Sequence, residues 1–131
     1  MDDLIAAALA ARDFAHAPYS GFRVGAALGV RDGRVFTGCN IENASYGLTL
    51  CAERVAIFKA MSEGVRREEF TMLVVSADTP VLTPPCGACR QIISEFTPAS
   101  MEILLVNLQG DRESFRIEDL LPRSFNDSFI K

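Results

Sequence analysis

The sequence predicts an α/β fold in which buried strands alternate with helices. Residues 72–75 and 103–106 are short, continuous apolar runs, which are typical of strands covered on both faces. Between these runs Ala88, Ile92 and Phe96 recur every four residues, which is the spacing of one side of a helix. A helix between two such strands implies a right-handed crossover and parallel strands.

The N-terminal part predicts one helix followed by a β-hairpin. Residues 4–15 are rich in alanine at helical spacing and indicate the helix. Residues 24–30 and 34–39 are β-type runs. They are joined by Asp32-Gly33, a strong signal for a hairpin with a two-residue loop.

A second helix is expected from about Cys51 to Gly64, which is a natural C-terminal cap. The residues of this helix that we expect to face the core are Val55, Phe58 and Met61.

The rest of the chain predicts the end of the third helix at Thr97-Pro98, a short strand at 115–117 and a helical turn at 118–121. After the hairpin the order of elements is therefore β-α-β-α-β, with no repeat, linker or low-complexity segment. A chain of 131 residues has the size of one domain, so we expect residues 1–131 to form a single domain.

Composition and charge argue against several classes of partner. Thirteen basic and seventeen acidic residues give a net charge of −4 without a basic cluster, so no nucleic-acid partner is expected. Asp2 and Asp3 stand where a signal peptide carries basic residues, and no apolar run reaches membrane-spanning length. We therefore expect a cytoplasmic protein without a membrane partner. Its four cysteines are then reduced and suited to metal binding or catalysis.

The motifs C-A-E and P-C-G-A-C are the most informative part of the sequence. Their thiols, Cys51, Cys86 and Cys89, can fill three positions of a tetrahedral zinc ion and leave the fourth for water. Glu53 can reach that water without binding the metal. Both motifs begin helices that follow strands, so both helix starts lie at one edge of the sheet. The positive dipole ends there favour thiolates.

Two other interpretations of the cysteines are considered. A lone C-x-x-C can be a dithiol redox motif, but that leaves Cys51 and Glu53 unexplained. A purely structural zinc site needs a fourth protein ligand, for which Cys39 and His16 are the candidates. Cys39 ends an apolar strand and is more typical of a buried small hydrophobe. His16 has the position of a surface residue after the first helix.

With these residues in place, the chain resembles the cytidine and deoxycytidylate deaminase family, and within it the small, homotetrameric, zinc-dependent cytidine deaminases. The resemblance covers residues 11–125. It rests on A-P-Y-S-G-F-R-V-G-A-A-L, G-C-N-I-E-N-A-S-Y, C-A-E-R, P-C-G-A-C-R-Q and the D-L-L-P that ends at Pro122. It implies a three-layer α-β-α sandwich around a mixed sheet of about five strands, and one zinc ion per subunit bound by three cysteines.

The resemblance also implies the reaction. Cytidine and deoxycytidine are deaminated hydrolytically to uridine, deoxyuridine and ammonia, as in pyrimidine salvage. Glu53 would take a proton from the zinc-activated water, deliver it to N3 of the base and return one to the leaving amine. Three thiolates leave the zinc site with a net negative charge. Arg54 matches the family arginine that hydrogen-bonds the ligand sulfurs and offsets this charge.

Substrate contacts follow from the same resemblance. Asn40 and Glu42, two positions apart at a strand end, point the same way and match the pair that holds the ribose. The charge of Glu42 would repel a phosphate, which favours a nucleoside. The remaining substrate-binding candidates are the base-flanking Phe22 and Phe125, the helix residue Ala52, and Ala44 and Tyr46, which match a segment that completes a neighbouring subunit's site.

Two rival functions stay open at this point. The first is a related deaminase that acts on another cytosine nucleoside, such as the antibiotic blasticidin S. The second is a zinc-stabilised interaction module without turnover, which would have its zinc fully closed by protein ligands.

Overall fold

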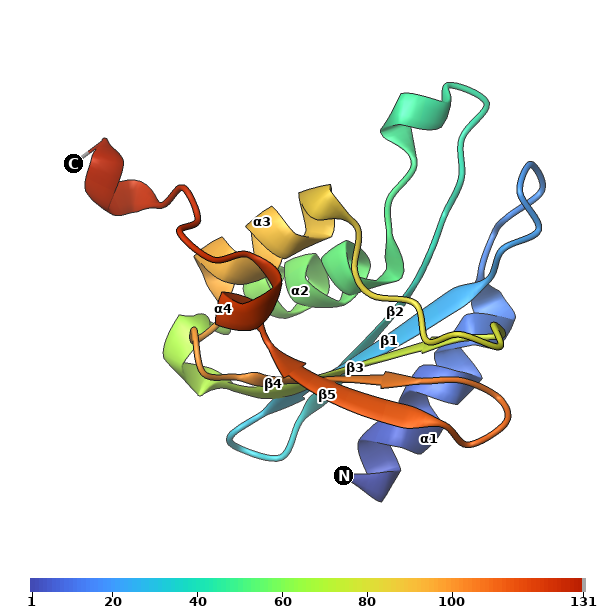
Figure 1. Ribbon diagram of the computed structural model, residues 1–131, viewed down its shortest axis with the longest axis horizontal. Helices are drawn as coiled ribbons and strands as arrows, with labels where there is room; N and C mark the ends of the chain where they lie inside the picture. The colour runs from blue at the N-terminus through green and yellow to red at the C-terminus, as the bar shows by residue number, and fades with distance from the viewer. Residues whose placement is uncertain (131) are drawn as a thin grey trace.

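The computed structural model describes residues 1–130 and shows a five-stranded sheet between two layers of helices (Figure 1). The strand order is β2-β1-β3-β4-β5. The strands are β1 (Val24–Val30), β2 (Val35–Cys39), β3 (Phe70–Ala77), β4 (Glu102–Val106) and β5 (Arg112–Arg116). The helices are α1 (Asp2–Ala11), α2 (Ala52–Ser62), α3 (Gly87–Phe96) and α4 (Ile117–Leu120). Helix α1 covers one face of the sheet, and α2 and α3 lie over the other, which confirms the three-layer α-β-α sandwich (Figure 1).

The sheet is mixed, as expected. Strand β1 pairs antiparallel with both β2 and β3, β3 pairs parallel with β4, and β5 returns antiparallel. The strands β2, β3 and β4 therefore point in one direction, as the β-α-β-α-β order requires. Because β1 lies between β2 and β3, only β3 and β4 are parallel neighbours.

Burial explains the apolar runs of the sequence. All seven residues of β1 are buried, as are seven of the eight residues of β3. One apolar cluster lies under α2 and α3, and a smaller one lies under α1. Both faces of the central strands are therefore covered.

Two glycines allow the helices to lie close to the sheet. A Cβ atom on Gly38 would lie 2.6 Å from the backbone nitrogen of Ala56 in α2. A Cβ atom on Gly25 would lie 2.6 Å from the backbone nitrogen of Arg12, just after α1. These separations are too short for any side chain, so glycine at both positions fixes the distance between helix and sheet.

The close contact at Gly38 changes the buried side of α2 from the predicted one. The expected inward residues Val55 and Met61 are only partly buried, and Phe58 is 39% exposed. The residues that face the sheet are instead Ala52, Glu53, Ala56, Ile57 and Ala60. The small side chains of Ala52, Ala56 and Ala60 fit the narrow space beside β2, and the Phe58 ring lies at the rim.

Other element boundaries also differ from the prediction. Helix α1 ends at Ala11 and continues as the 3-10 turn Arg12–Phe14. The hairpin loop has three residues rather than two, because Val30 N–H bonds to Arg34 O at 3.0 Å and Gly33 takes a positive φ of 97°. Strand β5 starts three residues earlier than predicted. It is a mostly exposed, charged edge strand without an apolar run to mark it.

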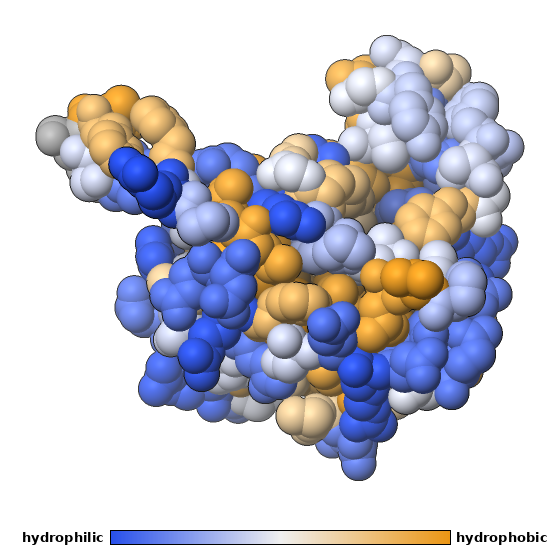
Figure 2. All heavy atoms as spheres, in the orientation of Figure 1, coloured by the Kyte–Doolittle hydropathy of each residue, from blue (hydrophilic) through white to orange (hydrophobic). Residues whose placement is uncertain are grey.

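Two segments project from the body on the side of α2 and α3. One is the loop between β2 and α2, with the 3-10 turn Tyr46–Leu48, and the other is the chain after α4 (Figure 1). Figure 2 shows apolar side chains over this C-terminal segment, where Phe125, Phe129 and Ile130 are 59%, 67% and 75% exposed. Within residues 1–130, no helix combines the length and the apolar character that a membrane crossing requires.

Candidate active site

The starts of α2 and α3 bring the three predicted ligands together. Cys51 is the N-cap of α2 and Cys86 is the N-cap of α3, and Cys89 follows in the first turn of α3. Their three Sγ atoms lie within 4.8 Å of one another. The topology causes this, because both helices follow strands that run in the same direction and so begin at the same sheet edge.

The sulfur positions fit a tetrahedral zinc ion. The Sγ atoms of Cys51 and Cys86 are 3.7 Å apart. Two thiolates at about 2.3 Å from a tetrahedral ion are separated by about 3.8 Å, whereas a disulfide requires about 2.05 Å. Neither Cys39 nor His16 belongs to the cluster, and within residues 1–130 no further Cys, His, Asp or Glu joins it. A closed structural site built with either of them is therefore not what this structure shows.

The thiols share their protons unequally. A hydrogen bond from the Cys89 thiol, helped by Arg54, lowers the pKa of Cys51 to about 5. The pKa of the buried Cys89 thiol is raised in turn, first by this hydrogen bond to Cys51 and then by burial. The lowered pKa favours the thiolate form of Cys51, and a bound cation would displace the remaining thiol protons.

Arg54 contacts the cysteine cluster. Its guanidinium donates to Cys51 Sγ at 3.4 Å and to the backbone oxygen of Thr49 at 3.3 Å. The hydrogen bond to Cys51 raises the pKa of Arg54 above its ordinary value, so the side chain stays charged. The second contact fixes the guanidinium against the loop that leads into α2.

Glu53 lies in the first turn of α2 and is only 4% exposed. Burial raises its pKa to about 7, and the negative charge at Cys51 acts in the same direction. A bound dication beside it would favour the carboxylate instead. A carboxyl group in this range can both accept and donate a proton at neutral pH, which is the requirement for general acid–base work.

A cavity of about 210 Å³ opens beside the cysteines. Five of the predicted substrate-binding residues line it, together with the predicted ligands Cys51 and Cys86 and with Glu53. These five are Phe22, Asn40, Glu42, Tyr46 and Ala52. Ala44 and Phe125 do not line it in the single chain. Sequence reasoning missed several other lining residues, above all Ser20, whose only signal is its place in a turn two residues before Phe22.

Asn40 and Glu42 make contacts that the sequence did not predict. Asn40 Oδ1 accepts from Val24 N–H at 2.9 Å, and its Nδ2 donates to Phe22 O at 2.7 Å. Glu42 Oε1 accepts from the backbone N–H groups of Tyr19 and Ser20 at 3.0 and 3.1 Å. The pair therefore holds the chain between residues 19 and 24 against the end of β2, in addition to lining the cavity.

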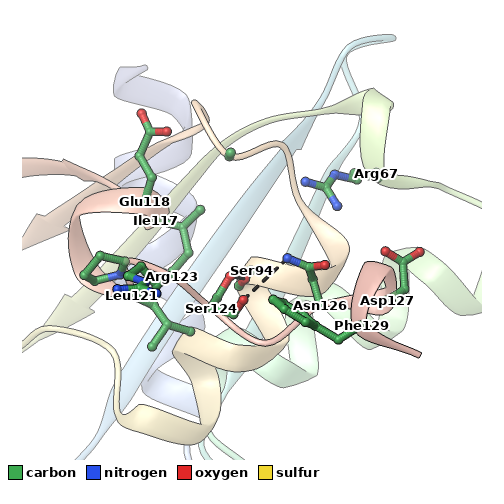
Figure 3. Close-up of a pocket in the computed structure, with 12 residues that line it drawn as sticks. Arg67, Ser94, Ile117, Glu118, Leu121, Arg123, Ser124, Asn126, Asp127 and Phe129 are labelled. Carbon is green, nitrogen blue, oxygen red and sulfur yellow. Dashed lines mark hydrogen bonds between the residues drawn. The ribbon is translucent and has the colours of Figure 1, made fainter. Parts of the chain in front are cut away.

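Phe125 lies on the C-terminal segment. Its backbone oxygen accepts a hydrogen bond from Gln91 Nε2 of α3 at 2.9 Å, and its ring stacks on Phe129 with centroids 5.7 Å apart. A further bond joins Ser94 and Ser124 at 2.9 Å, drawn as a dashed line in Figure 3. Helix α3 therefore carries two zinc-ligand candidates at its start and anchors the C-terminal segment further along.

The cavity in Figure 3 is larger, at about 660 Å³, and lies between α3, α4 and the C-terminal segment. None of the predicted site residues lines it. Because the thiols and the buried carboxyl converge on the smaller cavity, chemistry and not size identifies the candidate active site.

Comparison with known proteins agrees with this geometry. Residues 1–105 match the family model for the cytidine and deoxycytidylate deaminase zinc-binding region. The chain is 54% identical over 122 residues to a cytidine deaminase of Halalkalibacterium halodurans, covering 93% of this chain and 91% of the relative. It is 52% identical over 126 residues to a cytidine deaminase of Sporosarcina psychrophila, covering 96% and 91%.

Solved structures lead to the same family. The crystal structure of a cytidine deaminase from Burkholderia pseudomallei superposes with a TM-score of 0.92 at 52% identity, covering 95% of this chain and 98% of that one. The fold, the cysteine cluster and these matches agree, and the chain belongs to the cytidine and deoxycytidylate deaminase family.

Proposed function

We propose that this protein is a zinc-dependent cytidine deaminase that converts cytidine and deoxycytidine, with water, to uridine and deoxyuridine plus ammonia, as in pyrimidine salvage. One observation carries the proposal: three sulfurs with zinc-binding separation and a buried carboxyl, Glu53, border the same cavity. The high identity to cytidine deaminases over nearly the whole chain supports it.

Each group at the cavity has its own role in the proposed reaction. Cys51, Cys86 and Cys89 would hold the zinc ion, which would make a bound water molecule acidic enough to lose a proton near neutral pH. The Glu53 carboxylate accepts a proton from the water oxygen and donates it to N3 of the cytosine ring. The water oxygen then bonds to C4. Glu53 takes the remaining proton of that oxygen and passes it to the 4-amino nitrogen, and the C4–N bond breaks so that ammonia leaves and the C4 carbonyl of the product forms. Arg54, through its bond to Cys51, offsets part of the thiolate charge.

The substrate contacts are part of the proposal. Asn40 keeps a second N–H on Nδ2, and the Glu42 carboxylate keeps unused acceptor capacity, so both can still bind sugar hydroxyls. Hydrogen bonds, first from the Ser20 hydroxyl, lower the pKa of Glu42, so it is anionic at neutral pH and disfavours a phosphate. Phe22 and Ala52 form apolar walls for the base.

We further propose a cytoplasmic homotetramer in which residues 1–131 form one catalytic domain. Ala44, Tyr46 and Phe125 then act at a neighbouring subunit's site. Two observations support this assembly. The segments that carry these residues project from the body, and Tyr46 and Phe125 are 58% and 59% exposed (Figure 1).

An ultraviolet assay tests the function directly. Purified protein, with its zinc content measured, is incubated with cytidine, deoxycytidine, cytosine, cytidine monophosphate and blasticidin S. Rapid conversion of the two nucleosides, with the other three turned over far more slowly, is expected. Faster turnover of blasticidin S than of cytidine would favour the rival deaminase. Zinc-loaded protein that turns over none of these compounds would overturn the enzyme proposal in favour of an interaction module.

A further inference from the structure

One wall of the candidate active site is a short loop without regular structure, residues 18–23, which precedes β1. Its turn is closed by a hydrogen bond from Gly21 N–H to Ala17 O at 2.9 Å, and Gly21 has a φ of +68°. Asn40 and Glu42 hold the backbone of the loop and the first residue of β1, as described above. The loop therefore depends on side chains for its position, and those side chains line the same cavity.

Ser20 is hydrogen-bonded both to Glu42, at the end of β2, and to Phe22, in the loop. Its hydroxyl donates a hydrogen bond to Glu42 Oε2. The hydroxyl oxygen, Ser20 Oγ, also accepts a hydrogen bond from Phe22 N–H at 3.0 Å. The hydroxyl thus joins a carboxylate and an aromatic residue that both line the cavity, and Ser20 lines it as well. An alanine at this position would break both hydrogen bonds at once, while the bonds of Asn40 and Glu42 to the backbone of the loop and of Val24 would remain available.

The Ser20 hydroxyl also determines how the Glu42 carboxylate is oriented. Glu42 Oε1 is occupied by two backbone N–H groups, so the bond from Ser20 to Oε2 restrains rotation of the carboxylate. A carboxylate oxygen can accept two hydrogen bonds, so Oε2 keeps one acceptor position for another donor. With Ser20 in place, that position has a defined direction in the free protein. A ligand hydroxyl that bonds there would not have to order the carboxylate first.

We infer that Ser20 is a positioning residue for the nucleoside sugar: its hydroxyl orients the carboxylate of Glu42 and fixes Phe22, so that sugar and base are bound together. The inference rests on the proposed function and adds to it. Ser20 does not touch the reacting atoms. Its removal should therefore weaken binding much more than it slows the chemical step.

The test compares kcat and KM for cytidine in the wild type, Ser20→Ala, Ser20→Thr and Ser100→Ala. Ser20→Ala should raise KM about tenfold while kcat stays within about twofold, because the charged acceptor Glu42 is no longer oriented before the substrate binds. Ser20→Thr keeps the hydroxyl and should restore KM to within about threefold. Ser100 is exposed in the turn before β4 and lies outside the cavity, so Ser100→Ala is the matched control and should behave as wild type.

A double-mutant cycle separates positioning from a general effect on the loop. If Ser20 acts through Glu42, Ser20→Ala should change KM about twofold or less when it is added to Glu42→Gln. Zinc content, measured for every variant, should stay at the wild-type value in Ser20→Ala, and its melting temperature should fall no further than that of Glu42→Gln.

The possible outcomes are distinct. An unchanged KM in Ser20→Ala, a full tenfold effect in the Glu42→Gln background, or a rise in KM accompanied by loss of zinc or by a larger fall in melting temperature than in Glu42→Gln would each overturn the inference while the proposed function stands. Failure of Ser20→Thr to recover would also overturn it. A wild-type protein that leaves cytidine unchanged would overturn the proposed function itself, and the inference with it.

Discussion

The proton affinity of Glu53 is set by its immediate surroundings. Burial raises its pKa to about 7, and the charge on Cys51 adds to the rise, while Arg54 opposes it. The carboxyl is therefore suited to repeated proton transfer. We expect Glu53→Gln to keep the fold and the zinc but to lower kcat by at least about 10²–10⁴-fold, the usual contribution of a positioned acid–base group.

The measurement pairs zinc content with cytidine turnover in the same preparation. Glu63→Gln, which changes an exposed carboxyl just after α2, is the matched control and should keep both values. A zinc-loaded Glu53→Gln protein with wild-type turnover would contradict the role assigned to Glu53.

Glu42 allows a prediction about stability and pH. Hydrogen bonds, first from the Ser20 hydroxyl and then from the backbone of Ser20 and Tyr19, lower its pKa below the ordinary value of 4.5. A carboxyl whose folded-state pKa is depressed stabilises the fold above its unfolded pKa, and that contribution disappears as the pH falls through the folded value. The wild type should therefore lose more thermal stability between pH 6 and about pH 3 than Glu42→Gln does.

Melting temperatures across this pH range test the prediction. The difference between the two proteins should be largest near pH 6 and should shrink steadily below about pH 4.5. Parallel curves that keep a constant separation down to about pH 3 would show that the carboxylate form of Glu42 adds nothing to stability.

At the scale of elements, the sequence predicted the central strands and the starts of the helices better than it predicted the buried side of a helix or the position of an edge strand. The cysteines were found because two ligands mark helix N-termini and the third lies one turn further on. The buried side of α2 could not be predicted, since it depends on Gly38 in a different element. Strand β5 has no apolar run, and it exists because β4 offers it an edge.

The second contacts of Asn40 and Glu42 were equally hidden from the sequence. Their spacing at the end of β2 predicts that both point the same way, and both line the cavity. Asn40 and Glu42 can hold residues 18–23 only because this loop folds back against the end of β2. No local pattern encodes this long-range contact, which joins residues about twenty positions apart.

Gly38 gives a prediction at this same scale. Its missing side chain lets α2, with Ala56 facing it, lie against β2, and Cys51 and Glu53 stand at the start of that helix. Gly38→Ala should push α2 away from the sheet and cost about 1–3 kcal/mol of stability. It should also displace both site residues, so zinc content and turnover per folded molecule should fall.

Gly25→Ala is the comparison that separates these effects. It introduces a similar clash on the opposite face of the sheet, against α1. It should therefore lower the melting temperature by a similar amount while the folded fraction keeps its zinc and its kcat. Equal losses of kcat per folded molecule in the two variants would show that the position of α2 on β2 does not set the site.

At the scale of the whole molecule, the candidate active site of one chain lacks one of its predicted walls. Phe125 is held away from the cavity by its contacts with Gln91 and Phe129, and its side chain is largely exposed. If a neighbouring subunit supplies this ring, Phe125→Ala should lower kcat/KM by about tenfold or more without loss of zinc, because a stacked aromatic contact to the base is removed.

Hybrid oligomers distinguish this arrangement from an effect within one chain. Pure Glu53→Gln protein is expected to be nearly inactive and pure Phe125→Ala protein about tenfold less efficient than the wild type, and the two defects are complementary. In a mixed oligomer, a Phe125→Ala subunit keeps its own Glu53 and can receive Phe125 from a Glu53→Gln neighbour. Co-refolded mixtures should therefore exceed the summed activity of the two parents several-fold.

The control mixture pairs Phe125→Ala with a chain that carries both substitutions, which has no Phe125 to donate and should show no gain. A mixture that is no more active than its parents, in oligomers shown to contain both chains, would place Phe125 outside the neighbour's site.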